Sequence, residues 1–136
     1  MDTNVIVSAM RSPSGRNRQV LRACLEGRLQ PILGQALFSE YEDVLGRDAL
    51  FAGTPLSLVE RQDLLDAFFH VTEWVRVYYL WRPNLRDEGD NHVLELAVAG
   101  SASAIITNNV SDFQRTELRF SEVRILRPDE IMKELI

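Results

Sequence analysis

Short apolar runs alternate with amphipathic helical segments along almost the whole chain, and this alternation is the feature that most constrains its fold. Apolar residues recur at helical spacing over residues 16–26, 35–45, 57–72 and 91–99. Brief apolar runs that we expect to be strands lie at 4–9, 30–33, 75–80, 104–106 and 123–126. Strands that are apolar throughout are typical of a parallel sheet covered by helices on both faces. The sequence therefore predicts an α/β fold with a mainly parallel central sheet.

Residues that start helices support these boundaries. Ser57 and Glu60 have the spacing of a capping box, which predicts that a helix begins at this serine. Pro128 suits the first turn of a final helix. The polar stretch 82–89 is expected to be a loop between a strand and the helix that follows it.

The length and apolar content fit one domain over residues 1–136, since 46% of the residues are hydrophobic. No apolar run reaches the roughly 18 to 20 residues of a membrane helix, and the N-terminus lacks the layout of a secretion signal. We therefore expect a cytoplasmic protein without a membrane partner. The single Cys24 lies on an apolar helix face, so we expect a buried and inert thiol.

The charge argues against a protein that holds nucleic acid by a large basic face, because the formal net charge is -5. The cationic residues are arginines except Lys133, and a guanidinium suits bidentate contact with phosphate. Arg11, Arg16 and Arg18 follow the first apolar run and are candidates to bind substrate phosphates. Solvated loop arginines are the alternative interpretation.

Acidic and amide side chains occur in four fragments that are far apart in the sequence, and three of the four lie where the chain enters or leaves a predicted strand. The positions are Asp2, Asn4, Glu40, Asp87, Asp90, Thr107, Asn109 and Asp112. In an open parallel sheet, ligands bind beyond the carboxyl ends of the strands. Carboxylates crowded into one pocket repel each other unless they take up protons or a cation binds, and ligands that are all oxygen favour Mg²⁺ or Mn²⁺. Such a cation can activate a water molecule and stabilise a leaving oxygen.

In the order and spacing of four short segments, the chain resembles the PIN-domain ribonucleases, in particular the VapC-like toxin components of bacterial toxin–antitoxin pairs. The resemblance covers nearly the whole chain. It rests on Asp-Thr-Asn at 2–4, Ser39-Glu40, the segment 90–97, and the segment 106–109 followed by Asp112-Phe113. It implies a three-layer α/β/α sandwich and Mg²⁺- or Mn²⁺-dependent cleavage of RNA. It also implies an antitoxin partner that blocks the site, and a homodimer.

The resemblance further implies roles for individual residues. Asp2, Glu40, Asp90 and Asp112 correspond to the catalytic, metal-binding acids, with Asn4, Thr107 and Asn109 as polar support and Asp87 as an additional candidate ligand. The chain departs from the family in two respects. Relatives usually carry several apolar residues before the first aspartate, and many carry an acid where this chain has asparagine at 109.

Simpler interpretations of the same residues remain open. Asp90 can be a helix N-cap, Asp112 can cap a turn, and Glu40 can be a solvated helix residue. His70 and His92 are isolated in the sequence, which disfavours a zinc site, and we expect the second to be an exposed helix histidine, with substrate contact as the alternative. The aromatic residues of 74–81 are expected to pack in a strand or at an interface, more than to stack on bases.

Two other functions compete with a nuclease. A phosphotransferase that forms an aspartyl-phosphate usually places a second aspartate two residues after the first, where this chain has Asn4. Phosphate-loop and dinucleotide folds are disfavoured because no glycine-rich loop follows a predicted strand. The second competitor is a PIN-like binding module that has lost catalysis through its short start and Asn109.

Overall fold

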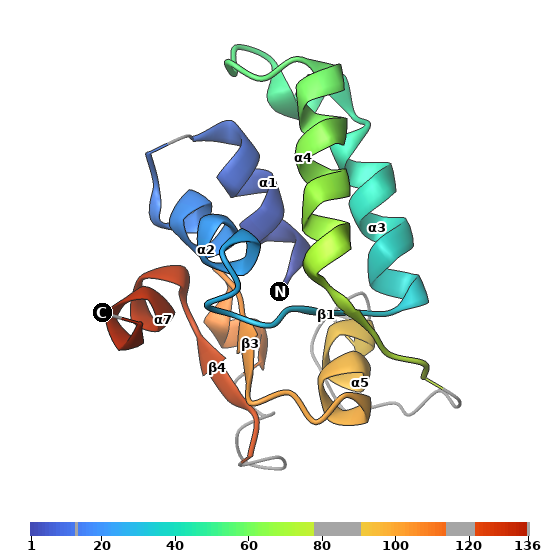
Figure 1. The fold of residues 1–136 in the computed structure, drawn as a ribbon, viewed down its shortest axis with the longest axis vertical. Coiled ribbons are helices and arrows are strands. Elements are labelled where there is room, and N and C mark those ends of the chain that lie inside the picture. Colours follow the sequence, from blue (N-terminus) through green and yellow to red (C-terminus); the bar gives the residue numbers. More distant parts are fainter. Residues whose placement is uncertain (13, 78–90, 114–121, 136) are drawn as a thin grey trace.

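The computed structural model describes residues 1–12, 14–77, 91–113 and 122–135 (Figure 1). Its α-helices are α1 (Thr3–Arg11), α2 (Arg16–Leu25), α3 (Gln35–Leu45), α4 (Leu58–Val71), α5 (Asn91–Ala99) and α7 (Pro128–Glu134). Short 3₁₀ turns form η1 (Asp48–Phe51) and η3 (Val110–Phe113). The strands are β1 (Ile32–Leu33), β2 (Glu73–Trp74), β3 (Ala104–Ile106) and β4 (Arg124–Leu126).

The strands pair in two separate parallel sheets. Ile32 of β1 lies opposite Glu73 of β2, and Ile105 of β3 lies opposite Ile125 of β4. The predicted α/β class and the parallel pairing are thus confirmed. Among the described residues, however, the strands form two small pairs in place of one central sheet. The three-layer sandwich stays a prediction.

The first apolar run is a helix, so the prediction of a strand over 4–9 is wrong. Val5 and Ile6 of α1 are completely buried, and so are Ala9 and Met10, which follow them four positions later. Buried residues separated by four positions lie on one face of a helix. The β-branched residues favoured a strand locally, but packing of this face against α2 and α3 outweighs that preference.

The predicted strand over 75–80 is also corrected. In the described part of this segment, strand pairing ends with β2 at Trp74, and Val75 adds one hydrogen bond from its N–H to the carbonyl of Leu33 at 2.8 Å. Residues 78–80 and the expected loop at 82–89 lie outside the described residues. The ring of Trp74 is exposed and makes an edge contact with Phe38.

The helices of the core follow the predicted apolar spacing. Helices α3 and α4 lie side by side in Figure 1 and are joined by aromatic contacts, with Tyr41 and Phe38 of α3 facing Phe68 and Phe69 of α4. Cys24 is buried in the same core, as expected, and burial raises the pKa of its thiol to about 11. Within the ranges that the structure covers, no helix is both long and apolar enough to cross a membrane.

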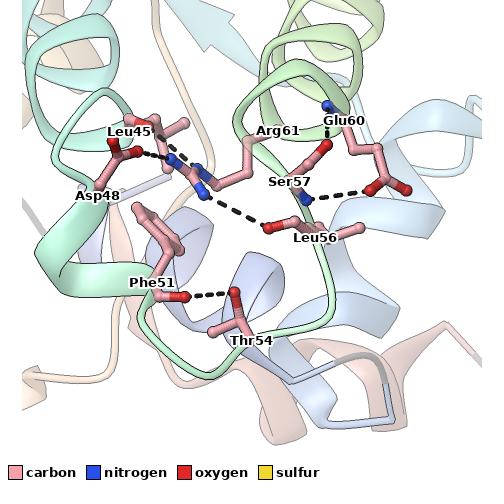
Figure 2. Close-up of polar contacts among 8 residues, drawn as sticks. All are labelled: Leu45, Asp48, Phe51, Thr54, Leu56, Ser57, Glu60 and Arg61. Atoms are coloured by element: carbon pink, nitrogen blue, oxygen red, sulfur yellow. Dashed lines mark hydrogen bonds and ion pairs between the residues drawn. The ribbon is translucent and has the colours of Figure 1, made fainter.

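The connection from α3 to α4 is closed by the buried side chain of Arg61, which is 4% exposed (Figure 2). Its Nε donates to the carbonyl of Leu45 at 3.3 Å, and its Nη1 donates to the carbonyl of Leu56 at 3.4 Å. Nη2 pairs with Asp48 at 2.6 Å, and the guanidinium lies 4.4 Å from the centre of the Phe51 ring. One side chain thus holds both ends of the connection. The predicted capping box at the start of α4 is also present, with Ser57 and Glu60 each bonding the other's backbone.

Candidate functional site

Asp2 is fixed at the carboxyl end of β3. Its backbone N–H donates to the carbonyl of Ile106, the last residue of that strand, at 2.9 Å. The residue directly precedes α1 in extended conformation and is only 5% exposed. The first acid of the sequence is therefore built into the fold beside the β3–β4 pair.

The carboxylate of Asp2 is held by two side chains. Oδ2 accepts hydrogen bonds from Oγ1 of Thr107 at 2.7 Å and from Nδ2 of Asn4 at 3.2 Å. Thr107 is completely buried directly after β3, and its N–H donates to the carbonyl of Leu126 in β4 at 3.0 Å. Oδ1 accepts no side-chain hydrogen bond from the residues that the structure covers. Burial raises the pKa of Asp2, and the bond from Thr107 acts in the opposite direction.

Amide side chains extend this arrangement. Oδ1 of Asn4 accepts hydrogen bonds from the N–H and the Nδ2 of Asn108 at 3.2 and 3.3 Å. Nδ2 of Asn108 also donates to Oδ1 of Asn17 in α2 at 2.9 Å. The N–H of Asn109 donates to Oγ1 of Thr107 at 3.0 Å. This amide network joins the first turns of α1 and α2 to the loop after β3.

Glu40 is the second acid that the structure brings to this place. It lies in the middle of α3, and its Oε2 is 2.5 Å from Nε2 of His92 in the first turn of α5. The hydrogen bond with His92 lowers the pKa of Glu40, while partial burial opposes that shift. The hydroxyl of Thr3 adds a smaller effect in the same direction as His92, although its geometry falls short of a hydrogen bond. The negative charge of Glu40 in turn makes the smallest of the contributions to the pKa of Asp2, in the raising direction.

The neighbour of Glu40 explains why α3 lies beside the start of the chain. Tyr41 is buried, and its hydroxyl donates to the carbonyl of Met1. Burial raises its pKa well above the ordinary range, so it stays an O–H donor at neutral pH. Because Glu40 and Tyr41 are consecutive, the bond to Met1 also keeps Glu40 near Asp2.

The other predicted acids are not part of this cluster as described. Asp87 and Asp90 lie outside the described residues. Asp112 is half-buried in η3, where its N–H donates to the carbonyl of Asn109 at 3.0 Å. Within residues 1–12, 14–77, 91–113 and 122–135, no three acidic, histidine or cysteine side chains lie together as a metal-binding group. The structure thus brings Asp2, Asn4, Thr107 and Asn109 together with Glu40 nearby.

The three arginines proposed for phosphate binding lie around the α1–α2 connection. Arg11 is exposed at the end of α1. Nη1 of Arg16 donates to Oε1 of Gln19 at 2.9 Å, and Nε of Arg18 donates to the carbonyl of Ala9 at 2.6 Å. Arg18 therefore caps α1, while the other two side chains remain exposed.

Sequence reasoning missed four polar residues of this region. His92 was expected to be an exposed helix histidine, which is wrong, because its side chain is 22% exposed and bonded to Glu40. Glu95, one turn later in α5, is buried, and its Oε1 has no partner among the described residues. A charged residue within the apolar run Val-Leu-Glu-Leu-Ala was a signal for Glu95. Asn17 and Asn108 gave no such signal.

Asp2 and Glu40, which we call the acid pair, have oxygen atoms that suit a hard divalent cation. Oδ1 of Asp2 and Oε1 of Glu40 are carboxylate oxygens without a side-chain hydrogen bond of good geometry in the part of the chain that the structure describes. Thr3 adds a buried hydroxyl oxygen that has no partner there. Mg²⁺ and Mn²⁺ prefer oxygen ligands of this kind, and a cation would relieve the cost of burying the charge on Asp2. The donor atoms present therefore fit such an ion.

Comparison with known proteins adds one finding. A protein-family model described as a PIN domain matches residues 1–111, which includes Asp2, Glu40 and the loop after β3. PIN domains are generally nucleases. No curated protein and no solved structure matches the chain.

Proposed function

This chain belongs to the PIN-domain family, and we propose that it is an Mg²⁺- or Mn²⁺-dependent ribonuclease that hydrolyses RNA phosphodiester bonds with a metal-activated water. The observation that carries the proposal is the buried carboxylate of Asp2, which Thr107 and Asn4 hold at the end of β3, while the bond from Tyr41 to Met1 keeps Glu40 beside the start of the chain. A buried carboxylate with a second, partly buried acid nearby favours a bound cation.

In this proposal Asp2 and Glu40 bind the ion together with Asp90 and Asp112. The bound ion supplies a Lewis acid that lowers the pKa of a water molecule and neutralises a phosphoryl oxygen. Thr107 and Asn4 hold Oδ2 of Asp2 in one orientation, which leaves Oδ1 for the ion. Asn109 acts through Thr107, because its N–H donates to the hydroxyl oxygen of that residue. The protein thus contributes preorganised oxygen ligands.

The proposed substrate is RNA, and the exposed Arg11 and Arg16 are candidates to contact its phosphates. The net charge of -5 implies that few phosphates are neutralised, so binding relies on the site more than on a basic face. We also propose that the protein is the toxin component of a type II toxin–antitoxin system. Its partners would be a cognate antitoxin that covers the acid pair and a second copy of the chain.

The metal dependence is tested by mixing the purified protein with end-labelled single-stranded RNA. We expect cleavage with millimolar Mn²⁺ or Mg²⁺, none with excess EDTA, and loss of cleavage in Asp90→Asn because a metal ligand is removed. Asp63→Asn is the matched control, since this aspartate is exposed on α4. Cleavage that persists in EDTA or is equal in Asp90→Asn contradicts the proposed roles. A rise in melting temperature with Mn²⁺ but no cleavage favours the binding-module alternative.

The toxin role makes a prediction in living cells. Induced expression in a bacterial host should arrest growth, because an active ribonuclease depletes RNA, and co-expression of the product of a small neighbouring open reading frame should restore growth. The measurement is colony formation after induction, with Asp2→Asn as the inactive comparison. Equal growth with the parent and the variant would argue against a toxin even where cleavage is found in vitro.

A further inference from the structure

We infer that His92 is a positioning residue that fixes Glu40 in the orientation needed to bind the metal ion, an inference that rests on the proposed function. Its Nε2 lies 2.5 Å from Oε2 of Glu40, and the contact joins α5 to α3 across 52 positions of sequence. The side chains are 22% and 36% exposed, so solvent only partly screens the bond.

The contact leaves one oxygen of Glu40 for another ligand. The hydrogen bond uses Oε2, whereas Oε1 has no side-chain hydrogen bond from the residues that the structure describes. A glutamate on a half-exposed helix face otherwise samples several rotamers, and ordering it costs conformational entropy. A bond that selects one rotamer before the ion arrives removes that cost from metal binding.

His92 acts through Glu40 and is not itself placed to bind the ion. Its Nε2 is already engaged by Oε2 of Glu40. The other nitrogen, Nδ1, is buried and has no partner among the described residues. With the hydrogen on Nε2, the ring donates to Glu40, and Nδ1 is left as an acceptor. A cation bound by Glu40 would not need to displace this hydrogen bond. Hydrogen-bond partners of metal-binding carboxylates typically contribute to metal affinity in this way.

Apolar packing holds α5, the helix that carries His92, in place. The following residues Val93 and Leu94 are buried, and Leu96 packs so closely on Gly34 that an added Cβ there would lie 3.1 Å from Cδ1 of the leucine. At the end of α5, an added Cβ on Gly100 would lie 2.7 Å from Cδ1 of Ile32. The position of α5 is thus set by apolar packing on the β1 region, so removing the imidazole should change the orientation of Glu40 more than the fold.

The test measures Mn²⁺ affinity directly, by calorimetric titration of protein freed of metal, for the parent, His92→Ala, His92→Gln, Glu40→Gln and the double variant His92→Ala/Glu40→Gln. We expect His92→Ala to weaken Mn²⁺ binding about 10- to 100-fold, the range typical for such partners of metal ligands. His92→Gln should recover most of the loss because its amide can donate to Glu40. The double variant should bind Mn²⁺ no more weakly than Glu40→Gln alone, since His92 acts only through that carboxylate.

His70→Ala is the matched control, because this exposed histidine lies on α4 and its one side-chain hydrogen bond among the described residues is with the carbonyl of Asp66. It should bind Mn²⁺ as the parent does. Unchanged Mn²⁺ affinity in His92→Ala, with or without a lower melting temperature, overturns the inference and leaves a merely structural link between α3 and α5. A further loss in the double variant overturns it as well, because His92 would then contact the ion. Absence of Mn²⁺ binding in the parent overturns the proposed function together with the inference.

Discussion

Replacing Asp2 by asparagine is expected to slow RNA cleavage strongly and yet to leave the metal-free protein at least as stable as the parent. Burial raises the pKa of this carboxyl, so the folded state holds its proton more tightly than the unfolded state does. Its favourable contribution to folding is present at acidic pH and is lost as the pH rises from its ordinary pKa through the raised folded value. At neutral pH the ionised group is a net cost to folding that an asparagine does not carry.

The asparagine can keep the local structure, because its carbonyl oxygen can accept the hydrogen bonds from Thr107 and Asn4. What it cannot provide is the negative charge for the ion. A bound metal supplies several kcal/mol of transition-state stabilisation, so we expect cleavage to fall by about two to three orders of magnitude. The rise in melting temperature that Mn²⁺ gives the parent should shrink in parallel.

Melting curves at neutral pH with EDTA and with Mn²⁺, together with initial cleavage rates, measure both effects. Asp63→Asn, on the exposed face of α4, is the control and should match the parent in all of them. A variant that melts well below the parent in EDTA would mean that the ionised Asp2 stabilises the fold. That result would contradict the idea that the buried charge on Asp2 is unfavourable until a cation binds.

The second large effect is expected from Arg61→Met, which should lower the free energy of unfolding by about 3 kcal/mol. Methionine keeps much of the apolar stem, but it leaves the carbonyls of Leu45 and Leu56 without their donor. An unpaired buried polar group costs about 1 to 3 kcal/mol, and the stacking of the guanidinium on Phe51 is lost as well. Urea unfolding followed by circular dichroism gives the difference.

Asp48→Asn separates the ion pair from the backbone contacts. Its carboxylate is 76% exposed, so removing the charge should cost at most about 1 kcal/mol. Arg61→Lys should behave more like Arg61→Met, because one ammonium group cannot reproduce the forked geometry that bonds three acceptors. Equal losses in Asp48→Asn and Arg61→Met would assign the stabilisation to the ion pair instead.

The helices of the core could be predicted because their buried residues recur with a visible period. In α3 the buried Leu37, Tyr41 and Leu45 are spaced four apart. The run that became α1 was misread because Val5, Ile6 and Val7 favour a strand when neighbours are ignored. The division into two small sheets was also unforeseen, since strands of two or three residues carry too little pattern to show which of them pair.

For the site, the resemblance to PIN domains grouped Asp2 with Thr107, whereas the strand that was expected directly after Asp2 is helix α1. The partners on helices could not be anticipated, because Asn17 and His92 carry no periodic signal and reach the site only through the way α2 and α5 pack. Asp90 and Asp112 stay predictions, the first because it lies outside the described residues. The arginine roles likewise rest on the sequence and on the exposed positions of two of the three side chains.

The bond between Asp2 and Thr107 joins positions 105 residues apart, and the strand that supports it pairs with residues 124–126. During synthesis, Asp2 leaves the ribosome first, and Thr107 and the paired strands follow much later. A half-made chain therefore carries its acids without the framework that gathers them. The arrangement of Asp2 and Thr107 is therefore complete only after the chain has been synthesised through residues 124–126.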